Sequence, residues 1–189
     1  MSNSKYELMT DKKIDVFGRK LFRIRALNSF GSVNAGDEGG YVESESNLSD
    51  KGNAWVYCNA WVYGNAWVSG NAQVSDYAWV SGDAQVFGNA RVYGNARVYG
   101  NAWVSDYAWV SGDAWVDKRS SIFWASIVGS ENGTLTVFRC KYGVGVVRGC
   151  FVGTPDEFLE AVDKKHGADS KIGREYHLLM QVALSRVSE

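Results

Sequence analysis

The sequence predicts a mostly β fold in which short strands repeat along a solenoid. Eleven consecutive six-residue units, from Asn53 to Lys118, each place alanine second and valine fourth. The composition is biased in the same direction, with 21 glycines, one proline and eight tryptophans among 189 residues. Both features are typical of a chain that is built from one small structural repeat.

Each unit predicts a strand followed by a corner. The alanine and valine positions are two residues apart, so on an extended chain their side chains point to the same side, and the third and fifth side chains point to the other. The sixth and first positions are mostly Gly-Asn, Gly-Asp or Asp-Tyr, which favour turns and tolerate left-handed backbone. A helix is excluded, because a six-residue period cannot maintain an apolar stripe at helical spacing.

These units resemble the hexapeptide repeat of left-handed parallel β-helices, in which three units make one triangular coil. The resemblance implies that alanines and valines of successive coils stack inside, about 4.8 Å apart. Two looser units, RSSIFW and ASIVGS, extend the pattern over residues 119–130. Together the units predict about four coils, and both ends need caps because no single coil buries its own apolar face.

Three segments are therefore expected: an N-terminal β-hairpin cap over residues 1–46, the β-helix over 47–129, and a hairpin with two helices over 130–189. In front of the solenoid the repeat fades through Val42 and Leu48, each of which falls at the alanine position. These boundaries follow from the change in sequence pattern at each end of the repeat.

Strand patterns flank the repeat on both sides. Residues 14–27 alternate apolar and polar side chains around Gly18, which predicts two strands and a tight turn. Residues 134–153 have a similar pattern and predict a second hairpin that turns near Tyr142.

Two helices are predicted at the end of the chain. Thr154 is a suitable N-cap, Pro155 suits the first turn, and Glu157 completes a capping box. Gly167 should end this first helix. The second helix is indicated by an apolar stripe of Ile172, Tyr176, Leu179, Met180, Leu184 and Val187.

The outward positions of the solenoid carry aromatic and cationic side chains. The candidate binding or oligomer surface consists of Trp61, Trp79, Arg97, Trp115, Tyr63, Tyr99, Trp55, Arg91, Trp109 and Tyr93. With three units to a coil, the first six of these share one face. The other four share a second face with Gln73 and Tyr57, and a third face carries Trp67, Gln85, Trp103 and Phe87.

Soluble monomers rarely leave such a large apolar area exposed. We expect these rings to pack against sister chains in a homo-oligomer, most simply a trimer, or to bind a partner such as a host protein or a small nucleotide-like ligand. In the second case Arg91 and Arg97 could hold an anion while a ring is stacked beside it.

Charge and cysteine usage restrict the classes of partner and compartment. The formal net charge is −1, so there is no overall basic field of the kind that nucleic-acid and membrane-surface binders use. The N-terminus is polar and lacks an apolar segment, so neither export nor membrane insertion is expected. Cys58, Cys140 and Cys150 lack metal-type spacing, and they are expected to be free thiols in a reducing cytoplasm.

Catalysis is disfavoured by the distribution of histidines. Acyltransferases with hexapeptide-repeat folds resemble one another in using a histidine of the solenoid as a general base. Here the only two histidines, His166 and His177, belong to the predicted helices. No catalytic residue, metal site or cofactor is therefore predicted, and an acyltransferase-like enzyme remains the alternative.

The order of segments carries a second resemblance. LFRIRAL, GDEGGYVE, SNLSDKGNAWVY, the repeat itself, NGTLTVFR and TPDEF together resemble a family of small hexapeptide-repeat proteins encoded by bacteriophages and prophages. The resemblance implies a protein made in the cytoplasm of the infected bacterial host. The expected function is a non-enzymatic accessory protein that inhibits or sequesters a component of host antiviral defence, and a trimeric structural phage component is a further alternative.

Overall fold

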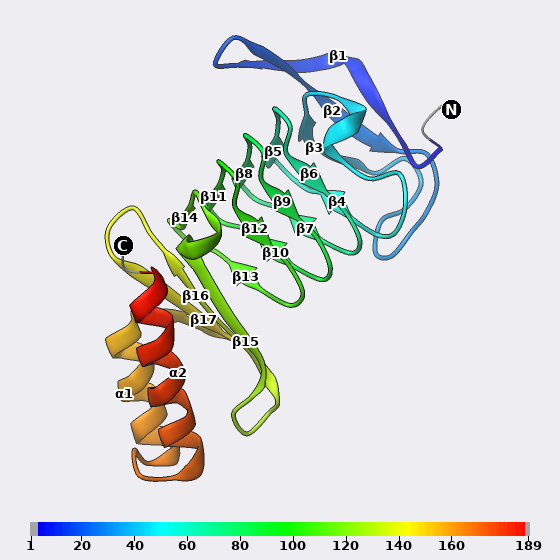
Figure 1. The fold of residues 1–189 in the computed structure, drawn as a ribbon. Helices are drawn as coiled ribbons and strands as arrows, with labels where there is room; N and C mark the ends of the chain where they lie inside the picture. Colours follow the sequence, from blue (N-terminus) through cyan, green and yellow to red (C-terminus); the bar gives the residue numbers. More distant parts are fainter. Residues whose placement is uncertain (1–3, 188–189) are drawn as a thin grey trace.

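The structure is a computed structural model that describes residues 4–187. A parallel β-solenoid of about four turns lies in the middle (Figure 1). An N-terminal sheet covers one end of the solenoid, and a C-terminal sheet with two helices covers the other.

Each regular unit forms one two-residue strand. A strand pairs in parallel with the strand 18 residues later, as Trp61 does with Trp79. Three units therefore close one turn, and three ladders result: β4-β7-β10-β13, β5-β8-β11-β14 and β6-β9-β12. The strands are β4 (Trp55–Val56), β5 (Trp61–Val62), β6 (Trp67–Val68), β7 (Gln73–Val74), β8 (Trp79–Val80), β9 (Gln85–Val86), β10 (Arg91–Val92), β11 (Arg97–Val98), β12 (Trp103–Val104), β13 (Trp109–Val110) and β14 (Trp115–Val116).

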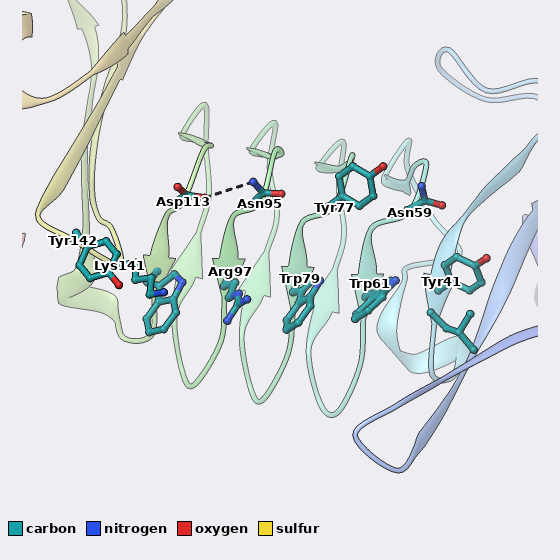
Figure 2. A pocket seen from close by; sticks show the side chains of 12 residues that line it. Tyr41, Asn59, Trp61, Tyr77, Trp79, Asn95, Arg97, Asp113, Lys141 and Tyr142 are labelled. Atoms are coloured by element: carbon teal, nitrogen blue, oxygen red, sulfur yellow. Dashed lines mark hydrogen bonds between the residues drawn. The ribbon is translucent and has the colours of Figure 1, made fainter.

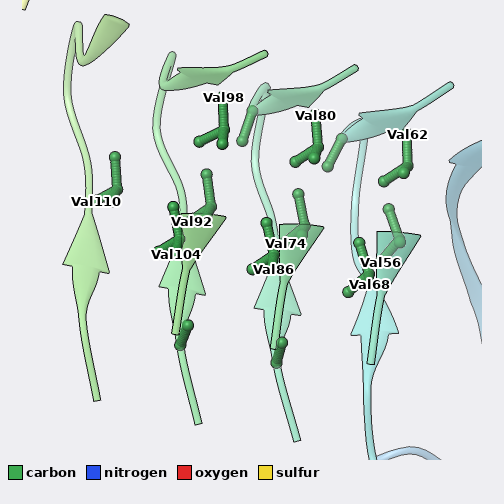
Figure 3. Packing of buried hydrophobic residues seen from close by; sticks show 14 of the residues in the cluster. Val56, Val62, Val68, Val74, Val80, Val86, Val92, Val98, Val104 and Val110 are labelled. Atoms are coloured by element: carbon green, nitrogen blue, oxygen red, sulfur yellow. The ribbon is translucent and has the colours of Figure 1, made fainter. Parts of the chain in front are cut away.

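The interior of the solenoid consists of the alanines and valines of the repeat. All of them, from Ala54 to Val116, are fully buried. Valines of successive turns lie in rows along the solenoid (Figure 3). Burying one valine side chain stabilises the fold by about 1.5 kcal/mol or more. The predicted inward placement of these two positions is confirmed.

The corners use left-handed backbone at the sixth position of the unit. Glycine occupies most of these positions, and Asp76 and Asp106 also have positive φ, at 60° and 57°. Neighbouring turns approach closely here: a Cβ on Gly82 would lie 2.9 Å from the backbone nitrogen of Gly100. Asp76 is accommodated with its carboxylate accepting a hydrogen bond from the Gly94 backbone N–H, at 2.9 Å. The predicted left-handed corners are confirmed.

The N-terminal sheet consists of β1 (Tyr6–Val16), β2 (Arg19–Ala26) and β3 (Glu38–Val42). β2 pairs antiparallel with both β1 and β3, and β3 also pairs in parallel with β5. The predicted turn at Gly18 is confirmed, whereas the first strand begins at Tyr6 and not near residue 14.

The predicted alignment of Val42 and Leu48 with the alanine position is wrong. Val42 pairs with Val62, and Leu48 pairs with Val68, so both occupy the valine position. The offset is 20 residues here and 18 in the regular turns. The corner between Leu48 and the first regular strand is two residues longer than the others, and this shifts the register. The short 3₁₀ helix η1 (Glu45–Asn47) precedes that corner.

Trp55 does not belong to the exposed surface on which it was predicted. Its side chain points away from the solenoid interior but is only 1% exposed. The rings of Tyr6 and Phe30 from the N-terminal segment pack edge-on against it, at 6.1 and 5.3 Å. β3 can lie this close to the first turn because it carries glycines: a Cβ on Gly40 would lie 2.6 Å from the Ala60 carbonyl oxygen.

A buried lysine ties the N-terminal segment to the first turn. The Lys5 ammonium donates hydrogen bonds to the carbonyl oxygens of Ser49, at 3.1 Å, and Ala54, at 2.7 Å. It also lies 4.5 Å from the centre of the Phe30 ring. Burial lowers the pKa of Lys5 from 10.5 to about 8, against the opposing effect of the Asp50 carboxylate.

The C-terminal sheet is antiparallel and consists of β15 (Ile122–Val128), β16 (Gly133–Arg139), β17 (Val144–Arg148) and β18 (Phe151–Gly153). The hairpin predicted to turn near Tyr142 is confirmed as β16-β17. The two looser units do not continue the parallel ladders: residues 119–128 form the 3₁₀ helix η2 (Arg119–Ser121) and β15, and a turn follows. They lack the alanine-valine pair that fits the narrow interior.

Two helices pack on this sheet, α1 (Pro155–His166) and α2 (Lys171–Val187). Thr154 and Glu157 form the predicted capping box, and Gly167, with φ 83°, follows the last turn. On α2 the apolar stripe faces the sheet. Tyr176 and Met180 are buried there in a second hydrophobic core, which the C-terminal sheet and the two helices form together. No helix within residues 4–187 is long and apolar enough to cross a membrane.

The burial of Lys5 predicts a specific pH dependence of stability. Between pH 8 and 10.5 the unfolded chain keeps the lysine proton that the folded chain has released, so the free energy of unfolding should rise with pH. Lys5→Met removes this contribution. In urea denaturation, the free energy of unfolding of the wild type should rise relative to that of the Lys5→Met variant as the pH increases through this range. A difference that is constant with pH would contradict the assignment.

Candidate binding groove

One face of the solenoid carries a continuous row of large side chains. Strands β3, β5, β8, β11 and β14 pair in register along this face. Their outward residues therefore follow one another at about 4.8 Å intervals, over about 19 Å in all. We call this row the aromatic ladder; it consists of Tyr41, Trp61, Trp79, Arg97 and Trp115.

The rings of the ladder stack on one another. Trp61 and Trp79 are nearly parallel, with ring centres 4.9 Å apart and 14° between planes. The Arg97 guanidinium lies 4.4 Å from the Trp79 ring centre and 5.3 Å from that of Trp115. Such cation-π contacts contribute about 0.5–1 kcal/mol each at exposed sites. The stacking occupies the inner ring faces, so the ladder presents mainly ring edges and N–H groups outward (Figure 2).

A groove of about 920 Å³ runs along the ladder. A second row, from the first position of the unit, borders it with Asn59, Tyr77, Asn95 and Asp113 (Figure 2). The caps supply its ends: Ile14 comes from β1, and Lys141 and Tyr142 come from the β16-β17 turn. The groove therefore depends on all three parts of the chain.

Six of the ten candidate residues meet at this ladder. Trp61, Trp79, Arg97 and Trp115 line the groove. On the far side of the ladder, Tyr63 and Tyr99 line a smaller hollow of about 210 Å³ together with Trp79, Arg97 and Trp115.

The remaining candidates lie on the neighbouring face and do not join the groove. The Arg91 guanidinium lies 4.9 Å from the Trp109 ring centre, and Tyr93 lines a hollow of about 180 Å³ beside them. The backbone of Trp109 is bound to the C-terminal sheet, because its N–H donates a hydrogen bond to Thr136 Oγ1 of β16 at 3.1 Å. Trp55, the fourth of these, is covered by the N-terminal segment.

The charges in the groove are few and mostly unpaired. Arg97 and Lys141 have no acidic partner within residues 4–187, and Asp113 is the acidic residue of the lining. The Asn95 side-chain amide points to the Asp113 carboxylate at 3.5 Å. Two basic groups and one acidic group leave the lining with a net charge of +1. Just behind the Lys141 end, burial raises the pKa of Cys140, and the Asp113 carboxylate adds to this, so this side chain stays a neutral thiol.

The histidines lie outside the groove. His166 is in the last turn of α1, and His177 of α2 is hydrogen-bonded to the Asp163 carboxylate, Nε2 to Oδ1 at 2.8 Å. Within residues 4–187 there is no group of three or more His, Cys, Asp or Glu side chains that could hold a metal ion.

Sequence reasoning missed several residues of the groove. Tyr41 precedes Val42 and would have been found had Val42 been aligned with the valine position. The first-position row was treated only as turn residues, although the period of the repeat places its members in line. Ile14, Lys141 and Tyr142 lie in the caps, and no periodic signal brings them to this face.

The comparisons with known proteins agree with the solenoid. A family model described as YdcK beta solenoid repeat matches residues 60–76, 84–98 and 96–112. These segments cover about a quarter of the chain and fall within the regular turns. The chain is thus similar to this repeat family over its solenoid. A search of curated proteins found no match.

Proposed function

We propose that this is a non-enzymatic binding protein that holds its partner in the groove along the aromatic ladder. The supporting observation is the Arg97 guanidinium, fixed between two tryptophan rings without an acidic partner within residues 4–187. A preorganised arginine beside tryptophan side chains is typical of binding hot spots. The groove lining contains no histidine, the general base that the acyltransferase-like alternative requires.

We further propose that the solenoid is a left-handed coil of the hexapeptide type and that the protein is a phage accessory factor. This part rests on the alanine-valine units and on the order of flanking segments, from LFRIRAL to TPDEF. Its partner is then a component of host antiviral defence, met in the cytoplasm of the infected bacterium. The further alternative, a structural phage component, would require the chain to be present in purified virions.

The proposed assembly is a homotrimer formed through the third face of the solenoid. Trp67 of this face is 45% exposed. Phe87 packs edge-on against Trp103 at 6.2 Å, and the Arg119 guanidinium lies 3.3 Å from the Trp103 ring centre. This face is separate from the ladder, so association through it leaves the groove open to a partner.

Replacing the ladder tryptophans tests the proposed function. Trp61→Ser, Trp79→Ser and Trp115→Ser together should abolish capture of the partner from infected-cell extract, because they remove the floor of the groove. The β-type circular dichroism spectrum should persist, since these side chains lie outside the core. Trp67→Ser, on the third face, is the matched control and should retain the partner. Equal capture by the folded triple variant would refute the assignment of the groove.

Sedimentation tests the assembly. The protein should sediment as a trimer at micromolar concentration, and Trp67→Ser with Trp103→Ser should shift it toward the monomer, because both rings lie on the proposed interface. The triple ladder variant should remain trimeric. A wild-type chain that sediments as a single monomeric species would exclude the proposed assembly.

A further inference from the structure

We infer that the ligand of the groove is an acidic peptide segment bound in an extended conformation. This inference rests on the proposed function and specifies the chemistry of the partner. It is supported by the hydrogen-bonding groups, the ring geometry, the charge and the length of the groove.

The ladder is rich in hydrogen-bond donors that have no acceptor. Within residues 4–187, neither the Arg97 guanidinium nor the indole N–H groups of Trp61, Trp79 and Trp115 donate a hydrogen bond. The edges of aromatic rings also carry partial positive charge. A ligand that supplies many acceptor oxygens, carboxylates above all, therefore complements this row, and a guanidinium binds carboxylates in a fixed, two-pronged geometry.

The ring faces inside the stack are not free for a flat ligand. Trp61 and Trp79 stack at 4.9 Å, and Arg97 fills the space between Trp79 and Trp115. Nucleobases bind to proteins largely by stacking on open aromatic faces. This disfavours the nucleotide-like ligand that the sequence suggested beside Arg97, since the guanidinium already occupies the space between Trp79 and Trp115 where a base would stack.

The charge of the groove fits a modest number of carboxylates. Arg97 belongs to the ladder, Lys141 lies at the end of the groove beside the β16-β17 turn, and Asp113 belongs to the second row. The resulting net charge of +1 is too small for a nucleic acid, whose affinity depends on many neutralised phosphates. A peptide with a few acidic side chains can pair with the two cations while its other side chains contact the ring edges.

The length and form of the groove suit an extended chain. The ladder spans about 19 Å, which corresponds to about six residues of extended peptide. Side chains of such a peptide alternate between its two sides, so every second residue would face the ladder. The second row, with Asn59, Tyr77 and Asn95, lies beside this path, and its side chains can hydrogen-bond to peptide backbone groups.

Fluorescence anisotropy with labelled, end-capped peptides of about eight residues tests the inference. The probes are a peptide that alternates Glu and Ala, its Gln-Ala and Lys-Ala counterparts, and oligo-dT of similar length. The Glu-Ala peptide should bind about tenfold or more tightly than the Gln-Ala peptide, because charged hydrogen bonds are stronger than neutral ones. Its affinity should fall in about 0.5 M salt, where surface charges are screened.

Arg97→Gln should weaken binding of the Glu-Ala peptide about tenfold or more, whereas Arg91→Gln, the matched change on the neighbouring face, should leave it unchanged. Equal affinities for the Glu-Ala and Gln-Ala peptides, no binding of either, or tighter binding of oligo-dT would each overturn the inference. If the peptides fail while the triple ladder variant still loses its partner, the proposed function stands and only the ligand class is wrong. If that folded variant keeps its partner, the function itself fails.

Discussion

The narrow interior of the solenoid is the constraint on which the rest of the structure depends. Its alanines and valines are fully buried over the whole length of the repeat, and protein interiors are packed too tightly to accept larger side chains without strain. With these two small positions in every unit, three units close one turn. The large rings have no room inside and must lie on the outside, one turn above another.

This stacking preorganises the outer surface. Because each turn repeats after 18 residues, identical positions of the unit form straight rows, and the Arg97 side chain is fixed between Trp79 and Trp115 before any ligand binds. A side chain that is already ordered loses little entropy on binding. The caps then do more than cover the ends, because Ile14 and Tyr142 also delimit the groove.

The sequence predicts the solenoid well because the repeat is encoded locally. A six-residue pattern that is repeated in every unit predicts the inward alanine-valine pair and the left-handed corners. It also predicts the in-line placement of Trp61, Trp79, Arg97 and Trp115. The capping box of the first helix is equally local. The two-residue shift at Val42 was not predictable in this way, since only the pairing between turns reveals it.

Neither the covering of Trp55 nor the ends of the groove could be predicted from the sequence. Trp55 has the same unit position as the exposed tryptophans, and its burial depends on Tyr6 and Phe30, which arrive from a segment without repeats. Likewise, no pattern in the β16-β17 turn indicates that Lys141 reaches the groove. Contacts between a repeat and its caps are non-local and specific to each chain.

Cysteine cross-linking tests most directly whether three units close one turn. Asn65 and Asp83 occupy the same corner in successive turns, with their side chains 2.9 Å apart, and equivalent residues of adjacent strands are about 4.8 Å apart, within the range for a disulfide. In a chain whose native cysteines are replaced, the pair Asn65→Cys with Asp83→Cys should oxidise rapidly to an intramolecular disulfide, and Asn65→Cys with Asn71→Cys should not. Rapid oxidation of the second pair, or failure of the first in the folded protein, would contradict the three-unit turn and with it the aromatic ladder.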